Sequence, residues 1–218
     1  MLLPHRVSFR HPSGARPPRT ALLLHGFKRQ ASIKSFAPAT GHHKWLEKLE
    51  EYAPECLAGT LGELLFLASL RCSKAVQLES LKHSLVVIFQ TEQPWITRED
   101  REDLWAAFGL PVYEQIYSLT GLIATECEAH DGLHITSGAK WSRKESGELW
   151  FREPAAWWED RGDAFAPSGL FGDVDKSLCQ CGRATPRLRV LGPAQRQVLR
   201  NADVVRGAGR RAFAAEVA

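Results

Sequence analysis

The first part of the chain contains no acidic residue before Glu47, although Lys and Arg are frequent there. Pro12, Pro17 and Pro18 lie in the same stretch among few apolar residues. This one-sided charge and polar composition predict a basic arm with little fold of its own over residues 1–42.

Long hydrophobic runs are also missing from this arm. Its only apolar run, residues 21–24, is too short for the core of a signal peptide or for a transmembrane helix. The net charge of the whole chain is +3, which indicates no particular partner. We therefore expect a cytoplasmic protein with neither a membrane nor a nucleic acid as its partner.

The chain has five cysteines, an odd number that does not suit a framework of disulfides. We expect no export signal and therefore a reducing compartment, where closely spaced cysteines bind metals more often than they form disulfides. Cys56 and Cys72 lie in apolar sequence of helical character and are predicted to be ordinary buried thiols. The other three are candidate metal ligands: Cys127, Cys179 and Cys181.

The 218 residues, 44% of them hydrophobic, are enough for one domain with a buried core. Residues 43–192 are predicted to form this domain, with helices over residues 43–52 and 61–71, where apolar residues have helical spacing. Residues 84–89 are apolar and rich in β-branched side chains, which is typical of a strand buried on both faces. Residues 193–218 are predicted to be a basic helical tail.

The strand over residues 84–89 is predicted to open a βαβ unit. Thr97 and Asp100 have the spacing of a capping box at the start of a helix, and Gly109 ends that helix. The next strand begins at residues 111–113, so the two strands are predicted to be parallel neighbours with a right-handed crossover. After residue 122, short strands separated by turns predict a more antiparallel sheet. The predicted fold class is therefore α/β.

Polar residues cluster directly after both strands of this unit, over residues 90–94 and 117–121. Ligands of such sheets bind beyond the carboxyl ends of the parallel strands. These two segments are therefore the predicted ligand-facing edge of the domain.

Three sulfurs and one imidazole are predicted to form a zinc site. Cys127 and His134 flank a turn, so two adjacent strands can present both side chains together. Cys179 and Cys181 form a C-x-C pair, which on an extended backbone can place both sulfurs on one side. Cys₃His is a ligand set typical of tetrahedral structural zinc, and His130 is the alternative imidazole.

The competing interpretation is that Cys127 is a small buried apolar residue and that Cys179 and Cys181 are an exposed reduced pair. Bound zinc would have a further consequence. It would fix residues 151–178, whose sequence shows little periodic order.

Several segments over residues 45–192 together carry a family resemblance. Two of them are Glu92-Gln93-Pro94-Trp95 and residues 107–113, the latter followed by Tyr117-Ser118-Leu119-Thr120. The first is similar to the Gly-Glu-Pro loop of the AMP-forming acyl-CoA ligases with its glycines replaced, and the second resembles the approach to that family's Tyr-Gly-x-Thr-Glu motif. Residues 124–127, 132–135 and 179–187 resemble the phenylacetate-coenzyme A ligase branch, and residues 45–59 resemble the segment that leads to the central sheet.

The resemblance implies a fragment of the adenylate-forming large domain. Members of this ligase family use ATP to convert a carboxylate to an acyl-adenylate and then to a coenzyme A thioester. By resemblance, Glu92 would lie along the adenine, Tyr117 would stack on the base and Thr120 would approach the phosphates of ATP or AMP. Asp173 would hold the ribose hydroxyls, a role that suits a carboxylate. Alternatively, Tyr117 only ends a strand and Asp173 is a turn residue.

Much of the family's catalytic equipment has no counterpart in this sequence. Gly121 stands where the family has a carboxylate, Pro193 stands where it has an arginine, and no lysine follows Lys176. A family-type phosphate loop is also missing, although charge stabilisation of the phosphoryl group dominates this chemistry. We therefore expect a truncated central fragment that is weakly active or inactive alone.

Two hypotheses of function remain open at this point. In the first, the chain is a ligase-type enzyme that works with a partner subunit supplying the missing parts. In the second, it is a noncatalytic, zinc-stabilised module that binds a nucleotide or another protein. Physical reasoning favours the second, because losses of cooperating catalytic groups multiply.

Overall fold

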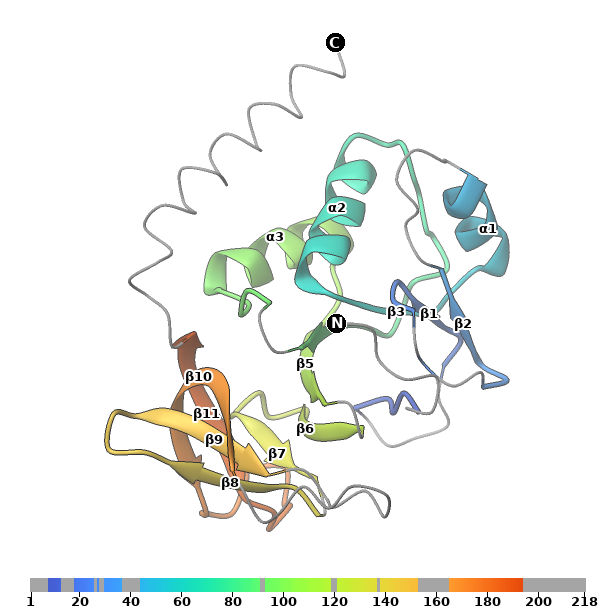
Figure 1. Ribbon diagram of the computed structural model, residues 1–218. Helices are drawn as coiled ribbons and strands as arrows, with labels where there is room; N and C mark the ends of the chain where they lie inside the picture. Colours follow the sequence, from blue (N-terminus) through green and yellow to red (C-terminus); the bar gives the residue numbers. More distant parts are fainter. Residues whose placement is uncertain are drawn as a thin grey trace.

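A computed structural model of the chain describes residues 8–12, 18–25, 27, 30–36, 44–90, 93–118, 121–136, 138–152 and 165–193. The strands of these residues form one sheet in the order β2-β1-β3-β4-β5-β6-β7-β11-β10-β9-β8. In Figure 1 the helices lie at one end of this sheet, and strands β7 to β11 gather at the other end. The elements are α1 (Lys44–Tyr52), α2 (Leu61–Cys72), α3 (Arg98–Phe108), β1 (Thr20–Leu22), β2 (Ile33–Ser35), β3 (Cys56–Gly59), β4 (Ser84–Phe89), β5 (Val112–Tyr117), β6 (Leu122–Glu126), β7 (Leu133–Ile135), β8 (Lys140–Arg143), β9 (Glu148–Arg152), β10 (Ala166–Asp175) and β11 (Arg187–Pro193).

The sheet changes from parallel to antiparallel at β5. Strands β2, β1, β3, β4 and β5 pair in parallel, whereas β5 pairs with β6 in antiparallel fashion and the later pairs are antiparallel too. The predicted βαβ unit is β4, α3 and β5. The predicted α/β class, with a parallel core and a later antiparallel part, is therefore confirmed.

Interactions between residues close in sequence determine where α2 and α3, the two longer helices of the parallel part of the sheet, begin or end. The Thr97 hydroxyl accepts a hydrogen bond from the Asp100 backbone N–H, and the Asp100 carboxylate accepts one from the Thr97 N–H, which completes the predicted capping box. Thr60 and Glu63 repeat this arrangement at the start of α2. Gly109 ends α3 with a φ of 66°, a conformation that glycine adopts without steric cost.

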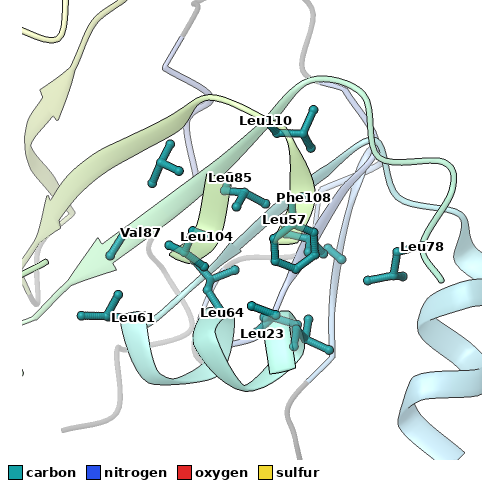
Figure 2. Packing of buried hydrophobic residues seen from close by; sticks show 14 of the residues in the cluster. Leu23, Leu57, Leu61, Leu64, Leu78, Leu85, Val87, Leu104, Phe108 and Leu110 are labelled. Atoms are coloured by element: carbon teal, nitrogen blue, oxygen red, sulfur yellow. The ribbon is translucent and has the colours of Figure 1, made fainter. Parts of the chain in front are cut away.

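The main core lies between these helices and one face of the sheet. Leu64 of α2 and Leu104 of α3 are fully buried there against Leu57 and Leu85 of the sheet, as Figure 2 shows. Alternate residues of β4, such as Val86, belong instead to a cluster on the opposite face. Strand β4 is therefore buried on both faces, as its uniformly apolar sequence predicts.

Part of residues 1–42 is folded, in contrast to the predicted arm. The described residues of this stretch include β1 and β2, and Leu22 and Leu23 are fully buried. Phe9 and Phe27 pack on the sheet face opposite the helices. A strand of three residues has too few positions to show a periodicity, and it is stabilised here by parallel pairing with the distant β3.

The antiparallel end also contains more strand than the sequence predicts. Strand β10 crosses the segment 151–178, for which the sequence shows little order. Residues 153–164 of that segment and the predicted tail from residue 194 onward lie outside the described residues. No helix among the described residues is long and apolar enough to cross a membrane.

The two cysteines predicted to be ordinary thiols have different environments. Cys56 is fully buried in β3, a strand rather than the helix expected, and burial raises the pKa of its thiol to about 11. Cys72 is exposed at the end of α2, contrary to the prediction.

Candidate metal centre

Two neighbouring chain reversals bring the four predicted metal ligands together. Cys127 directly follows β6, and His134 is the central residue of β7. Cys179 and Cys181 lie in the connection from β10 to β11. Because β7 pairs with both β6 and β11, the two reversals lie side by side. The four ligand atoms all lie within 4.8 Å of one another.

The first reversal needs an unusual backbone. The His130 N–H donates to the Cys127 carbonyl oxygen at 3.0 Å, and His130 itself has a φ of 49°. Gly132 has a φ of 90°, and a Cβ atom there would lie 2.6 Å from the carbonyl oxygen of Leu188 in β11. Only glycine allows this close approach of the turn to β11.

The second reversal is a tight turn around the C-x-C pair. The Gly182 N–H donates to the Cys179 carbonyl oxygen at 2.9 Å, and the Cys179 N–H donates to the Arg183 carbonyl oxygen at 3.3 Å. Gly182 has a φ of 82°, which favours glycine. The turn, rather than an extended backbone, presents both sulfurs to the same point.

Two of the distances between ligand atoms are close to those of a tetrahedral zinc site. Zn–S bonds of about 2.3 Å and Zn–N bonds of about 2.0 Å place ligand atoms about 3.5–3.8 Å apart in a tetrahedron. The Cys127 and Cys179 sulfurs are 3.7 Å apart, and the Cys181 sulfur lies 3.3 Å from Nε2 of His134. Cys127, Cys179 and His134 are buried, and Cys181 is half-buried.

The imidazole is oriented from its other side. Nδ1 of His134 lies 2.8 Å from the Thr185 hydroxyl oxygen, so Nε2 is the nitrogen that faces the sulfurs. Burial lowers the pKa of His134, which favours the neutral ring with a lone pair available. Partners of this kind beyond the ligands commonly fix the tautomer of a metal-binding histidine.

The thiols of the cluster differ in their electrostatics. Burial raises the pKa of Cys127 to about 12. The backbone N–H of Cys181 lowers the pKa of Cys179 by hydrogen bonding to its sulfur. A divalent cation among the sulfurs would favour the thiolate form of all three cysteines.

His130, the alternative imidazole, takes part in another polar cluster. Its Nδ1 lies 3.0 Å from a Glu126 carboxylate oxygen, and its ring stacks on Tyr113. Arg101 forms ion pairs with Glu126 and with Glu114, which is buried in β5. Burial raises the pKa of Glu114 to about 7. The sequence analysis did not predict this cluster. Acidic residues inside apolar strands indicate it, because buried carboxylates need charged or polar partners.

Of the residues predicted to face a nucleotide, the structure describes Tyr117 and Asp173, and these two are not gathered in the same way. Glu92 and Thr120 lie outside the described residues. Tyr117 ends β5 and is buried: its ring contacts Phe27 edge to face, and its hydroxyl oxygen accepts a hydrogen bond from the Arg10 N–H at 3.2 Å.

Asp173 lies far from Tyr117 in the strand order. It is exposed on β10, and its carboxylate accepts a hydrogen bond from the Val174 N–H at 2.8 Å. Strands β6, β7 and β11 separate β10 from β5. The structure therefore does not place these two residues on adjacent strands.

Comparison with known proteins gives a likeness of fold. No family model matches the chain, and no curated protein matches it significantly. Among solved structures, 2-hydroxyisobutyryl-CoA ligase in complex with 2-HIB-AMP and CoA is 17% identical, with a TM-score of 0.63 over 85% of this chain and 50% of that one. Coronafacic acid ligase from Pectobacterium brasiliense is 14% identical, with a TM-score of 0.53 over 84% and 41%.

A third similar structure is that of an enzyme whose name indicates a different reaction. The amide bond synthetase McbA from Marinactinospora thermotolerans is 14% identical, with a TM-score of 0.51 over 88% of this chain and 43% of that one. The present chain spans half or less of the length of these three proteins. Its fold is therefore that of a part of the adenylate-forming ligases.

Proposed function

We propose that this chain is a zinc-stabilised module of the phenylacetate-coenzyme A ligase-like branch, and that it does not by itself complete acyl-CoA formation. The observation that carries the proposal is the convergence of Cys127, His134, Cys179 and Cys181, whose ligand atoms lie within 4.8 Å of one another. The fold likeness to adenylate-forming ligases supports the ligase origin.

The donor set supports zinc over other metals. Three thiolates and an imidazole are soft or borderline ligands, which suit zinc and exclude magnesium and calcium as preferred ions. Four protein ligands fill a tetrahedron, so no position remains for water or a substrate. The site is therefore structural rather than catalytic.

The stabilising effect follows from which segments the ligands occupy. Cys127 and His134 belong to the β6–β7 reversal, whereas Cys179 and Cys181 belong to the β10–β11 connection. A metal ion bound by all four would join two segments that are 52 residues apart at Cys127 and Cys179. Its binding free energy would stabilise the folded antiparallel end of the sheet.

Two features support the absence of independent catalysis. Gly121 provides no carboxylate at the end of the ligase-like motif, and the ring of Tyr117 is covered by Phe27 of the same chain. Adenylate formation relies on charges and positioning that act together, so the loss of several parts removes more than each part contributes alone.

The zinc content of the protein tests this proposal. Protein purified without chelator is expected to contain about one zinc ion per chain. The variants Cys127→Ser and Cys181→Ser should lose most of it, whereas Cys72→Ser, at the exposed cysteine of α2, should retain it. A zinc-free wild type, or equal zinc content in all three variants, would overturn the proposal.

Nucleotide binding is a second candidate function, favoured by one specific observation. The similar 2-hydroxyisobutyryl-CoA ligase was solved with 2-HIB-AMP and CoA. In the present chain, ATP or AMP would be held by Glu92, Tyr117, Thr120 and Asp173. Access to the Tyr117 ring would require displacement of Phe27.

Calorimetric titration with ATP and with AMP tests this second function. Saturable binding that weakens in Thr120→Ala and Asp173→Asn would support it, whereas heats equal to those of buffer dilution would contradict it. A complete ligase activity would in addition need a partner subunit that supplies the missing catalytic groups. Pyrophosphate release from ATP and a carboxylic acid would reveal such activity.

A further inference from the structure

Arg187 is the largest fully buried side chain among the described residues. It lies in β11, 1% exposed, with its guanidinium pointing into the connections between strands. One terminal nitrogen donates to the Asp131 carbonyl oxygen at 3.1 Å and to the Asp131 carboxylate. The other donates to the Asp175 carboxylate at 2.8 Å and to the Ser177 hydroxyl oxygen at 2.9 Å.

These acceptors lie on the two segments that carry the metal ligands. Asp131 is in the reversal between Cys127 and His134. Asp175 and Ser177 directly precede Cys179. One guanidinium therefore binds both ligand-carrying segments at once.

Strand register places the same residue beside the imidazole ligand. Arg187 pairs with His134 in the antiparallel ladder of β7 and β11. Strand pairing thereby fixes the backbone of Arg187 relative to β7, the strand that carries His134. The contacts of Arg187 use none of the four ligand atoms of the site, so they can hold the two segments together before an ion binds.

We infer that Arg187 is the positioning residue of the metal centre, which holds the two ligand-carrying segments at the separation that zinc requires. This inference rests on the proposed zinc site. A site whose ligands are held in place before binding loses less conformational freedom on binding, and so has a higher affinity for the metal.

The chemistry of arginine suits this task better than that of lysine. The planar guanidinium presents its donors in a fixed fork, so two carboxylates and a hydroxyl can be bound at set directions. An ammonium group is a single point charge and cannot span both segments in this way. Asp131 and Asp175 also supply the opposite charges that a buried cation needs.

Arg189 provides a matched control on the same strand. Its guanidinium forms ion pairs with the same two carboxylates, at 3.2 Å to Asp131 and 2.9 Å to Asp175. Its side chain is 51% exposed, however, so solvent screens these pairs. Replacement of Arg189 by lysine alters contacts with the same two carboxylates but leaves the buried Arg187 guanidinium in place.

Competition between the full-length protein and a chromogenic chelator for zinc tests the inference. Arg187→Lys is expected to weaken zinc binding by about 10- to 100-fold, the range found for residues that orient metal ligands. Arg189→Lys is expected to weaken it by less than about threefold, as a surface pair would. Far-UV circular dichroism of the metal-free variants checks that both remain folded.

A second readout separates positioning from a general role in the fold. Cobalt spectra report the ligand geometry, and Arg187→Lys should reduce the intensity of the tetrahedral d–d bands while Arg189→Lys should not. If Arg187 serves only the fold, the metal-free variant loses stability but zinc affinity and the cobalt spectrum stay unchanged. That result would overturn the inference.

Two further outcomes are informative. If Arg187→Lys does not fold, Ser177→Ala removes a single hydrogen bond of the guanidinium and should weaken zinc binding by about fivefold; an unchanged affinity would overturn the inference. If the wild type binds no zinc, the proposed zinc site itself fails, which is distinct from zinc binding that is insensitive to Arg187.

Discussion

Nδ1 of His134 lies 2.8 Å from the hydroxyl oxygen of Thr185, and this contact leaves Nε2 as the nitrogen that faces the three sulfurs. Thr185 follows the C-x-C turn in the sequence, so the turn that supplies two sulfurs also leads to the residue that orients the imidazole. The supply of two sulfur ligands and the orientation of the imidazole therefore both depend on the short segment from Cys179 to Arg187.

Replacement of Thr185 by valine tests this orientation. Valine has a similar shape but cannot form a hydrogen bond with the imidazole. Zinc affinity should therefore fall by about tenfold, the lower end of the range for residues that orient metal ligands. Thr185→Ser keeps the hydroxyl and should retain near-normal affinity. Chelator competition measures both, and equal affinities of the valine variant and the wild type would show that the ring is oriented by other contacts.

Two glycines near the site should differ sharply in their tolerance of alanine. Gly132→Ala places a Cβ atom 2.6 Å from the Leu188 carbonyl oxygen and should cost more than about 3 kcal/mol of unfolding free energy, because backbone must move. Gly182→Ala meets no atom within 4 Å and should cost only about 1–2 kcal/mol, from its φ of 82°.

Chemical denaturation of the two alanine variants, with zinc present, measures this difference. Equal losses at the two positions would contradict the close approach of the first reversal to β11. A larger loss for Gly182→Ala would contradict it as well.

The buried carboxyl of Glu114 predicts a pH dependence of stability. Its pKa in the folded protein is about 7, raised by burial from an ordinary value of 4.5. The folded state therefore holds a proton that the unfolded state has lost between these two pH values, so stability should fall as pH rises from about 4.5 to 7.

Glu114→Gln isolates this contribution, because glutamine keeps a polar group but does not titrate. The variant should lack a decrease on the order of 3 kcal/mol across this range, at about 1.4 kcal/mol per pKa unit. Urea denaturation at a series of pH values measures it for both proteins. Parallel curves for variant and wild type would contradict the prediction.

The core beneath α2 gives a prediction about the parallel end of the sheet. Leu64 is fully buried in the main core, so Leu64→Ala should cost about 2–5 kcal/mol of unfolding free energy. Phe66 lies on the same helix but is 38% exposed, and Phe66→Ala should cost less. A larger loss at Phe66 would contradict the position of α2 on the sheet.

Local patterns in the sequence were sufficient for much of this fold. The capping box of Thr97 and Asp100, the apolar run of β4 and the stop at Gly109 all act within a few residues, so they can be recognised without the tertiary structure. The four candidate metal ligands could also be proposed from the sequence, because three thiols and an imidazole are a donor set typical of structural zinc.

Other features depend on contacts between distant residues and have no local signal. Strand β1 has three residues and is stabilised by pairing with β3. Arg187 lies in a strand where a charged residue normally indicates an exposed position, and contacts with distant residues, among them the carboxylates of Asp131 and Asp175, allow its burial. The cover that Phe27 forms over Tyr117 likewise joins residues 90 positions apart.

X-ray absorption at the zinc edge, on protein purified without chelator, identifies the atoms bound to the metal. A Cys₃His site gives three sulfur neighbours at about 2.3 Å and one nitrogen neighbour at about 2.0 Å. A shell of oxygen and nitrogen neighbours without sulfur, or protein that contains no zinc, would contradict it.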